Sequence, residues 1–529
     1  MKKISKTSKS SRTLKSLRTL QSFQSIKSLQ TLFNTHRVIG LFAVIVFLFS
    51  AVSAGSESGI FGEDDFSVDF LYLSSVSKEL IEDTFVFSDE WFLNDPAERN
   101  DRLGLASAWM AALSKEGEAP AEVFKNLGFL NVKAVRYDST QTDDCAYVIG
   151  TKEIIRDGKT ATLVAVVFQG RNYGAKGWLQ NVTVNPDNEI SIDHGSYAKA
   201  ARYFLSDIEE ILAGGNLVFW ISGLSRAGGI ANITAARLLE REDPPVVYCY
   251  TLEAPATTQN KDAKDPKYRS IHNYTCTDDP VPKVPLWDMV RYGNDYCYDS
   301  LPYEDVILTL NNQNSLSLDY TGLIDPSSFH DTVKLTLDTF INNLGRLIPT
   351  REDYSKVKTV TFPNGDTFQY SWQDSFGTIC KFIFKENRSN LKKSFSPGLA
   401  NNLLDMLSEE ILARRKALRS CVDEAPVFRM KERLLLAEDL SNAIEATMGM
   451  SYPKEDMYAL IRLLDLLIAP EIVLLEEDYS LTGDPADPAS IVFDNSDLDA
   501  FALYGSKILF SHQVDVIIAR LKLLALAME

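Results

Sequence analysis

The stretch from Asn216 to Glu240, NLVFWISGLSRAGGIANITAARLLE, decides the fold of this chain. Its first residues are apolar and rich in β-forming side chains, which predicts a buried strand, and the later alanines, isoleucines and leucines recur at helical spacing. The turn between strand and helix reads Gly-Leu-Ser-Arg-Ala-Gly and carries Ser225. Such a turn pushes the serine hydroxyl outward, while small neighbours let strand and helix pack closely. The stretch predicts a nucleophile elbow whose helix N-terminus would stabilise an oxyanion. A plain βα turn with a surface serine is the alternative.

The composition is that of an acidic globular protein. Hydrophobic residues make up 45% and charged residues 24% of the 529, which argues against disorder and allows more than one domain. The formal net charge is -18, yet residues 1–54 hold nine Lys and Arg residues and no Asp or Glu. The rest of the chain is therefore more acidic than the total suggests. Such a body repels phosphate backbones, so we expect no nucleic-acid partner.

The N-terminal segment predicts export. Residues 38–50, VIGLFAVIVFLFS, form an uncharged apolar run between a basic segment and small residues that end at Ala54. This order is typical of a signal peptide, cleaved here after Ala54. Retention of residues 1–54 as a membrane anchor, in contact with the membrane surface, is the alternative. Either outcome predicts a secreted or cell-envelope protein.

The patterns on both sides of the elbow predict an α/β-hydrolase with a mostly parallel central sheet. The run ATLVAVVF, residues 161–168, belongs in the middle of such a sheet, where both faces are covered. Helices are predicted at Leu103–Lys115, Tyr197–Leu212 and Val514–Ala527, and strands at Phe129–Tyr137, Cys145–Ile155, Thr160–Phe168, Pro245–Glu253 and Ser270–Tyr274.

Four regions are expected along the chain. A leader, residues 1–54, precedes a hydrolase core, 55–345; a mainly helical region, 346–505, is followed by a final loop and helix that return to the core, 506–529. The region 346–505 begins with a predicted β-hairpin at Val357–Phe368 and continues with leucines at helical spacing. It is interpreted either as a self-contained helical bundle or as a cap over Ser225 that receives acyl chains.

Catalytic partners for Ser225 are expected at two strand ends. The segment 277–285, TDDPVPKVP, follows the strand that ends at Tyr274, and a carboxylate there can orient a histidine and stabilise its protonated form. Asp278 and Asp279 compete for this role. The backbone N–H groups of Arg226, next to Ser225, and of Arg171, in the loop after residue 168, are the predicted oxyanion donors.

Several sequence blocks carry a family resemblance. FQGRN with GWLQN (168–181), HGSY (194–197), GLSRAGG (223–229) and TLEAP with DDPVPKVP (251–285) resemble, in order, the FRGT…DWxxN, HxGF, GHSxGG and FGxP…DxVPxxP blocks of the class 3 lipases. The similarity is greatest to their secreted bacterial lipase-like relatives. It implies an α/β-hydrolase fold, ester hydrolysis and Asp279 as the acid. Leu224, Gln169, Arg171 and Ala227 depart from the family's usual histidine, arginine, Ser/Thr and glycine, while the backbone donors survive these changes.

Two histidines after Asp279 are candidates for the base. His512 lies immediately before the predicted last helix, and His330 starts an apolar helical pattern 51 residues after Asp279. We favour His512, because a base on the loop before the final helix suits the topology and the ending of the family's relatives, and His330 is the alternative. His194 precedes the serine in the chain, the wrong order for this fold, so we expect it to be a structural hydrogen-bonding residue.

The six cysteines all lie after residue 54, and an even number in an oxidising compartment allows disulfides. Their spacing does not determine the pairing and does not resemble a zinc site. Cys276 and Cys297 flank the acid-bearing segment and are the first pair to test.

These features predict an exported serine hydrolase of ester bonds. Ser225 would attack a lipid or a small acyl ester, with Asp279 and His512 completing the triad, and no metal or organic cofactor is expected. An amidase or peptidase with the same triad is a neighbouring hypothesis. The alternative from another class is a catalytically inactive hydrolase-fold envelope protein that acts as a binding module.

Overall fold

The computed structural model describes residues 66–75, 79–114, 119–136, 145–169, 180–186, 191–277, 279–285, 287–298, 301, 303–313, 350–361, 367–373, 438 and 510–526. All of these except Glu438 belong to one compact unit formed by residues 59–430 and 459–529. Several predictions lie outside the described residues: the leader 1–54, Arg171, Asp278, His330 and the leucine-rich part of region 346–505.

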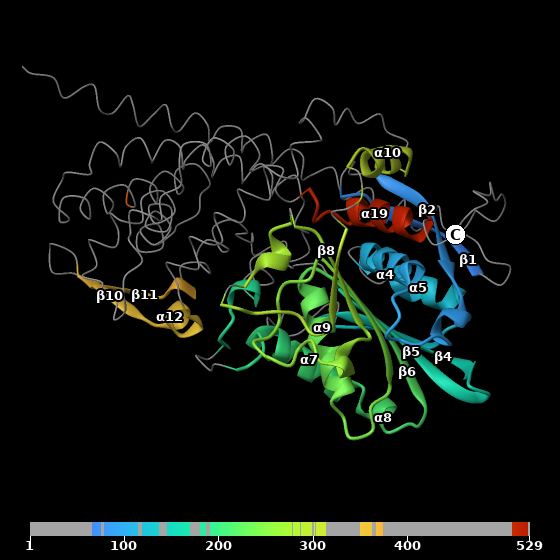
Figure 1. Cartoon of the computed structure of the whole chain (residues 1–529), viewed down its shortest axis with the longest axis horizontal. Coiled ribbons are helices and arrows are strands. Elements are labelled where there is room, and N and C mark those ends of the chain that lie inside the picture. The colour runs from blue at the N-terminus through green and yellow to red at the C-terminus, as the bar shows by residue number, and fades with distance from the viewer. Residues whose placement is uncertain are drawn as a thin grey trace, which may run out of the picture. The chain divides into compact units, whose positions relative to one another are not determined.

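A seven-stranded sheet forms the centre of this unit, with strand order β3-β4-β5-β6-β7-β8-β9 (Figure 1). The strands are β3 (Leu130–Val135), β4 (Tyr147–Arg156), β5 (Lys159–Phe168), β6 (Leu217–Leu224), β7 (Val246–Leu252), β8 (Ile271–Thr275) and β9 (Asn294–Cys297). Strands β3 to β5 pair antiparallel, and β5 to β9 pair parallel. The predicted mostly parallel α/β-hydrolase sheet is confirmed. Strand β9 was not predicted, because its four residues, NDYC, are half polar.

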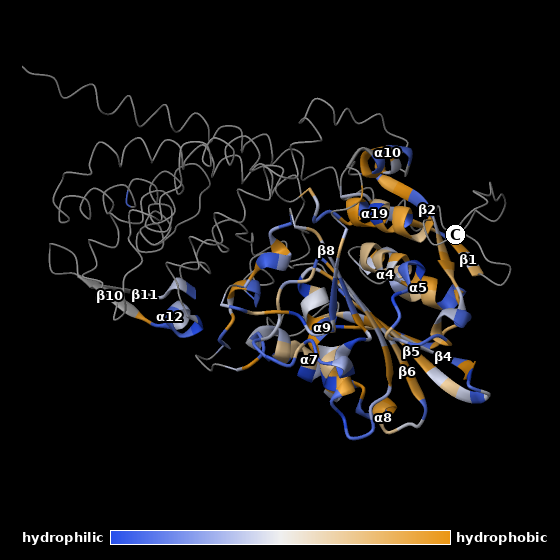
Figure 2. Ribbon diagram, viewed as in Figure 1, coloured by the Kyte–Doolittle hydropathy of each residue, from blue (hydrophilic) through white to orange (hydrophobic). Residues whose placement is uncertain are grey.

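Two hydrophobic cores cover the two faces of the sheet. In β5, Leu163, Ala165 and Val167 enter one core, and their alternating neighbours enter the other. Helices α4 (Asp101–Ser114), α5 (Ala119–Asn126) and α19 (Val514–Leu526) cover the first face; α7 (Gly195–Asp207) and α9 (Arg226–Leu239) cover the second. Hydrophobic residues are prominent in α19 and in the central strands (Figure 2). The last helix packs on α4, which in turn covers β5, β6 and β7.

Smaller elements surround this core. The aromatic segment near the start of the described chain forms a hairpin of β1 (Phe66–Leu73) and β2 (Leu80–Phe87), whose aromatic rings join the first core. The predicted helix Tyr197–Leu212 is divided at Ile208 into α7 and α8 (Glu209–Leu212). Beyond these lie η3 (Asp89–Phe92), η5 (Pro266–Tyr268), η6 (Val281–Lys283), α10 (Tyr303–Gln313), α12 (Arg351–Ser355), β10 (Lys358–Thr361) and β11 (Thr367–Tyr370). The antiparallel pair β10-β11 confirms the hairpin predicted for Val357–Phe368.

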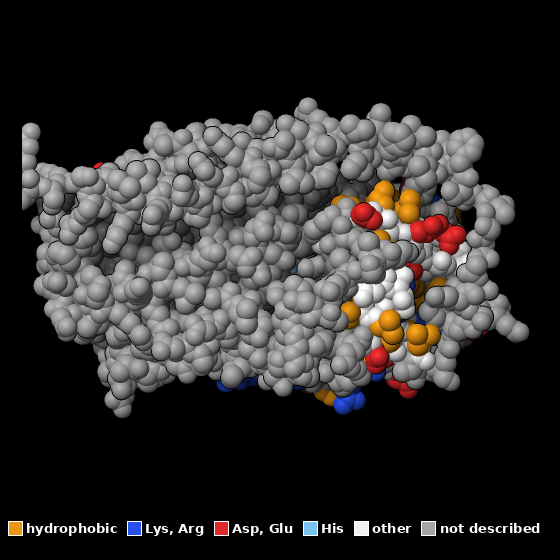
Figure 3. Space-filling model, turned by 90° about the horizontal axis from the view of Figure 1, so that it is seen from above, with side chains coloured by type: hydrophobic (Ala, Val, Ile, Leu, Met, Phe, Trp, Pro, Cys, Tyr) orange, Lys and Arg blue, Asp and Glu red, His pale blue; other side chains and the backbone are white. Residues whose placement is uncertain are grey.

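The described surface is consistent with an acidic body. Figure 3 shows acidic side chains beside hydrophobic ones on the described part of the face that it presents. Among the helices of the described ranges, none combines the length and the apolar character needed to cross a membrane. Within the same ranges, no three His, Cys, Asp or Glu side chains lie together as metal ligands would.

Candidate active site

Ser225 lies in the turn between β6 and α9, where the backbone is strained. Its φ is 60° and its ψ is -130°, a combination that non-glycine residues rarely adopt. The Ser225 N–H donates to the carbonyl of Leu252 at 2.8 Å, and the side chain is half-buried. The turn thus has the predicted form of a nucleophile elbow, with the hydroxyl at the carboxyl end of a central strand.

Two glycines of the turn are required by close packing. A Cβ on Gly223 would lie 2.5 Å from the Ala227 carbonyl oxygen, and one on Gly228 would lie 2.9 Å from the Cβ of Ala254. Ala227 itself is fully buried in the second core, where its methyl group fits. The departure from the family's glycine at this position therefore leaves the elbow intact.

The structure brings Ser225, Asp279 and His512 together. The His512 Nε2 lies 2.9 Å from the Ser225 Oγ, and the His512 Nδ1 lies 2.6 Å from an Asp279 carboxylate oxygen. Asp279 follows β8, and His512 stands directly before α19. These distances are those of hydrogen bonds in a line from carboxylate through imidazole to hydroxyl. In such an arrangement the carboxylate can orient the imidazole, and the imidazole can accept the serine proton.

Asp279 is held by donors on both of its oxygens. Its side chain is fully buried, its Oδ2 faces His512, and its Oδ1 accepts the N–H of Val281 at 2.8 Å. The side chain of His512 keeps 18% of its surface exposed. A buried carboxylate satisfied in this way is suited to hold one orientation of the ring.

The predicted oxyanion donors are only partly described. Arg226 is the first residue of α9, and N–H groups in the first turn of a helix have no partner within it. Its guanidinium group is buried, where it donates to the Gln180 side chain and lies 3.9 Å from the Cys145 sulfur. The side chain is thereby occupied by contacts away from the Ser225 hydroxyl.

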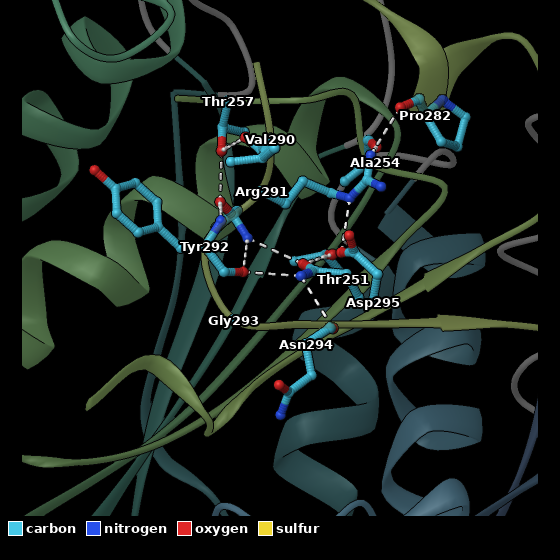
Figure 4. Close-up of polar contacts among 12 residues, drawn as sticks. Thr251, Ala254, Thr257, Pro282, Val290, Arg291, Tyr292, Gly293, Asn294 and Asp295 are labelled. Carbon is cyan, nitrogen blue, oxygen red and sulfur yellow. Dashed lines mark hydrogen bonds and ion pairs between the residues drawn. The ribbon is translucent and has the colours of Figure 1, made fainter. Parts of the chain in front are cut away.

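Arg291 is a site residue that the sequence did not indicate. Its guanidinium donates to the carbonyls of Ala254 at 3.1 Å and Pro282 at 2.8 Å, and its Nε donates to Asp295 at 3.0 Å (Figure 4). Ala254 packs on the elbow helix and Pro282 belongs to the loop that carries Asp279, so Arg291 ties the acid loop to the elbow. No motif surrounds it in the sequence that could have identified this role.

His194 is a buried structural residue, as predicted. It precedes α7, its Nε2 lies 3.2 Å from the carbonyl of Asn181, and its ring stacks on Tyr197 at 3.7 Å between centroids. Burial lowers the pKa of His194 to about 3. It therefore stays neutral and takes no part in the arrangement around Ser225.

Cys276 and Cys297, the first pair to test for a disulfide, form none in the structure. Cys276 is buried, Cys297 is exposed, and the two are not joined. Cys276 directly follows β8, whereas Cys297 is the last residue of the parallel strand β9, where it pairs with Thr275.

Residues 163–289 match the family model described as Lipase (class 3). This range contains Ser225 and Asp279 and ends before His512. No curated protein matches the chain.

Three solved structures are similar to part of the chain. A Rhizomucor miehei lipase propeptide complex is 16% identical, with a TM-score of 0.27, over 40% of this chain and 68% of that one. A lipase from Rhizopus microsporus var. chinensis is 13% identical, with a TM-score of 0.26, over 40% and 75% of the two chains. A triacylglycerol lipase from Penicillium expansum is 13% identical, with a TM-score of 0.24, over 36% and 80%.

Proposed function

We propose that this chain, whose residues 163–289 match the class 3 lipase model within an α/β sheet, hydrolyses carboxylic esters with Ser225 as the nucleophile. The observation that carries the proposal is the position of His512, whose ring bridges the Ser225 hydroxyl and the buried Asp279 carboxylate. A hydroxyl alone is a weak nucleophile, and a base within hydrogen-bonding distance activates it.

The reaction follows from this geometry in two halves. The Ser225 Oγ attacks the ester carbonyl while the His512 Nε2 accepts its proton, and the same proton then passes to the oxygen of the leaving alcohol. His512 then takes a proton from water as the water attacks the acyl-serine, and it returns that proton to the Ser225 Oγ as the acid leaves. Asp279 stays ionised throughout and stabilises the imidazolium that forms in each half.

The oxyanion of each tetrahedral intermediate would be held by backbone N–H groups. Arg226 supplies the first donor in this proposal, since it follows the nucleophile at the N-terminus of α9. Arg171 is proposed as the second donor because its loop leaves β5, the strand beside β6. Backbone donors are independent of the side chains that depart from the family pattern.

The substrate class and location are proposed from the sequence. A lipid or a small acyl ester is expected from the family match, and the segment 1–54 is proposed to direct export to the cell envelope or beyond. Mass spectrometry of the protein recovered from a producing cell tests export directly. A mature N-terminus at residue 55 supports cleavage, whereas an intact residue 1 supports an anchor.

A fluorophosphonate probe, which phosphonylates activated serines, tests the proposed activity. We expect labelling of the full chain at Ser225, together with hydrolysis of a p-nitrophenyl ester, and loss of both in Ser225→Ala. Ser222→Ala is the matched control, because Ser222 is buried in β6 and its hydroxyl faces the Val166 carbonyl instead. Absence of labelling and turnover in well-folded protein would contradict the proposal and favour a non-catalytic binding module.

A further inference from the structure

Glu253 is a buried acid that the proposed reaction does not use. It follows β7 directly, between Leu252, which accepts the Ser225 N–H, and Ala254, which packs on Gly228. Its φ is 44°, in the left-handed region that favours glycine, and its side chain is fully buried. A glutamate held in a strained backbone position beside a reactive serine calls for a functional explanation.

The contacts of Glu253 lead to the turn that carries Asp279. Its carboxylate Oε2 accepts the N–H of Cys276 at 3.0 Å, and the Cys276 carbonyl in turn accepts the N–H of Asp279 at 3.3 Å. The Glu253 backbone N–H donates to Tyr274, at the end of β8, at 2.8 Å. Side chain and backbone thus attach the end of β7 to the start of the acid turn.

The surroundings of the Glu253 carboxyl group disfavour its charged form. An ionised carboxylate needs several donors, and Asp279 has one on each oxygen. Within the described residues, the Glu253 Oε1 has no hydrogen-bond partner. Burial, and then the negative charge of Asp279, raise the pKa of Glu253 well above its usual value, although Arg520 and the Tyr298 hydroxyl act in the opposite direction.

Arg520 connects the same cluster to the histidine. It projects from α19, is almost fully buried, and donates to the Ser511 hydroxyl at 3.2 Å, one residue before His512. Its guanidinium carbon lies 5.3 Å from the centre of the Tyr298 ring. The charged and titratable groups around Glu253 are thus Arg520 from α19, Asp279 from the loop after β8 and Tyr298 directly after β9.

We propose that Glu253 is a positioning residue that works as a neutral carboxylic acid, holding the turn of Asp279 and leaving the negative charge beside His512 on Asp279. The inference rests on the proposed function.

The protonation of Glu253 is tested by stability, without reference to activity. An acid whose pKa is higher in the folded state than in the unfolded state stabilises the fold at low pH and loses that contribution as pH rises above its usual value of 4.5. We therefore expect Glu253→Gln to become progressively more resistant to urea than the wild type between about pH 4 and pH 8. If the difference in stability to urea between Glu253→Gln and the wild type were constant with pH, or changed in the opposite direction, Glu253 would not be a neutral acid.

The positioning role is tested by pH profiles of kcat/KM for ester hydrolysis. Glutamine still accepts a hydrogen bond from the Cys276 N–H and is uncharged, like a protonated glutamate. The kcat/KM of Glu253→Gln should therefore stay within about threefold of the wild-type value, and the acidic limb of its pH profile should not move. Glu253→Ala removes the acceptor, and kcat should fall about tenfold or more. An acidic limb moved down by about one pH unit in Glu253→Gln would show that Glu253 is charged.

An unchanged kcat in Glu253→Ala would show that it positions nothing. Glu253→Gly, which suits the backbone at this position, replaces Glu253→Ala if the latter does not fold. Activity that survives in Ser225→Ala would refute the proposed function, while the urea measurement would still decide the protonation of Glu253.

Discussion

The His512 Nδ1 lies 2.6 Å from Asp279, although 233 residues separate them in the chain. Helix α19 makes this contact, because Val514, Ile517, Ile518 and Leu521 anchor it in the core beside α4. Because α19 is fixed by this packing, the short loop before it has little freedom. His512 is therefore held near the end of β8 by hydrophobic residues that do not belong to the triad. The sheet and the last helix are therefore as much a part of the site as the polar side chains.

Replacing Asp279 should preserve the fold but greatly lower the kcat of ester hydrolysis. Asp279→Asn keeps the shape of the side chain but presents an amide to the imidazole, so the ring loses its orientation and the stabilisation of its charged form. We expect kcat to fall by about three to four orders of magnitude with little change in KM. The exposed Asp262→Asn is the control and should leave kcat unchanged. Equal kcat values for the two variants would remove Asp279 from the reaction.

The elbow should not tolerate a methyl group at its first glycine. A Cβ on Gly223 would meet the backbone of Ala227 at 2.5 Å, and backbone cannot move aside as a flexible side chain can. Gly223→Ala should therefore reduce the free energy of unfolding by about 1–3 kcal/mol or more and abolish labelling of Ser225. Gly215→Ala is the matched control, because a Cβ there meets nothing within 4 Å. Chemical denaturation of both variants checks the prediction, which fails if they are equally stable.

The acid loop should loosen without Arg291. Arg291→Ala removes the donors to Ala254 and Pro282, and we expect a loss of about 1.5–3 kcal/mol in stability and a lower kcat, since Asp279 lies in the same loop. Arg291→Lys retains the charge but not the forked geometry and should be intermediate. Arg269→Ala, at an exposed position, is the control. A wild-type kcat in Arg291→Ala would show that the loop carrying Asp279 keeps its position without Arg291.

His194 should make the fold sensitive to acid. Burial lowers the pKa of His194 to about 3 from an ordinary value of 6.5. Between these pH values, His194 is therefore protonated in the unfolded chain and neutral in the folded chain. Its contribution is present above pH 6.5 and is lost as the pH falls toward 3, with a slope of at most about 1.4 kcal/mol per pH unit. His194→Gln should flatten the acid limb of a urea-unfolding profile measured between these pH values. An unchanged slope would mean that His194 already takes up a proton in the folded protein.

The comparison of sequence and structure separates local from long-range information. The strand, turn and helix around Ser225 were predictable because the signals for each lie within 25 residues, and β5 was recognisable as a central strand by its unbroken apolar run. The assignment of Asp279 needed the family pattern, since an acidic turn after a strand is common. The contact between His512 and Asp279 joins distant segments, and its prediction needed the topology and the ending of the family's relatives.

Other features had no sequence signal strong enough to find them. Strand β9 is short and half polar, so its pairing with β8 depends on the neighbouring strand rather than on its own residues. The end of α7 at Ile208 and the role of Arg291 depend on packing and on carbonyls from separate loops. The burial of Glu253 and its strained backbone became visible only in the fold.

The most direct test of the account compares the two histidines. Full-length His512→Ala and His330→Ala are assayed side by side for fluorophosphonate labelling of Ser225 and for ester hydrolysis. The account predicts that His512→Ala loses about three orders of magnitude or more in kcat and that His330→Ala keeps the wild-type rate. Full activity in His512→Ala, with loss in His330→Ala, would contradict the central claim that the imidazole before α19 activates Ser225.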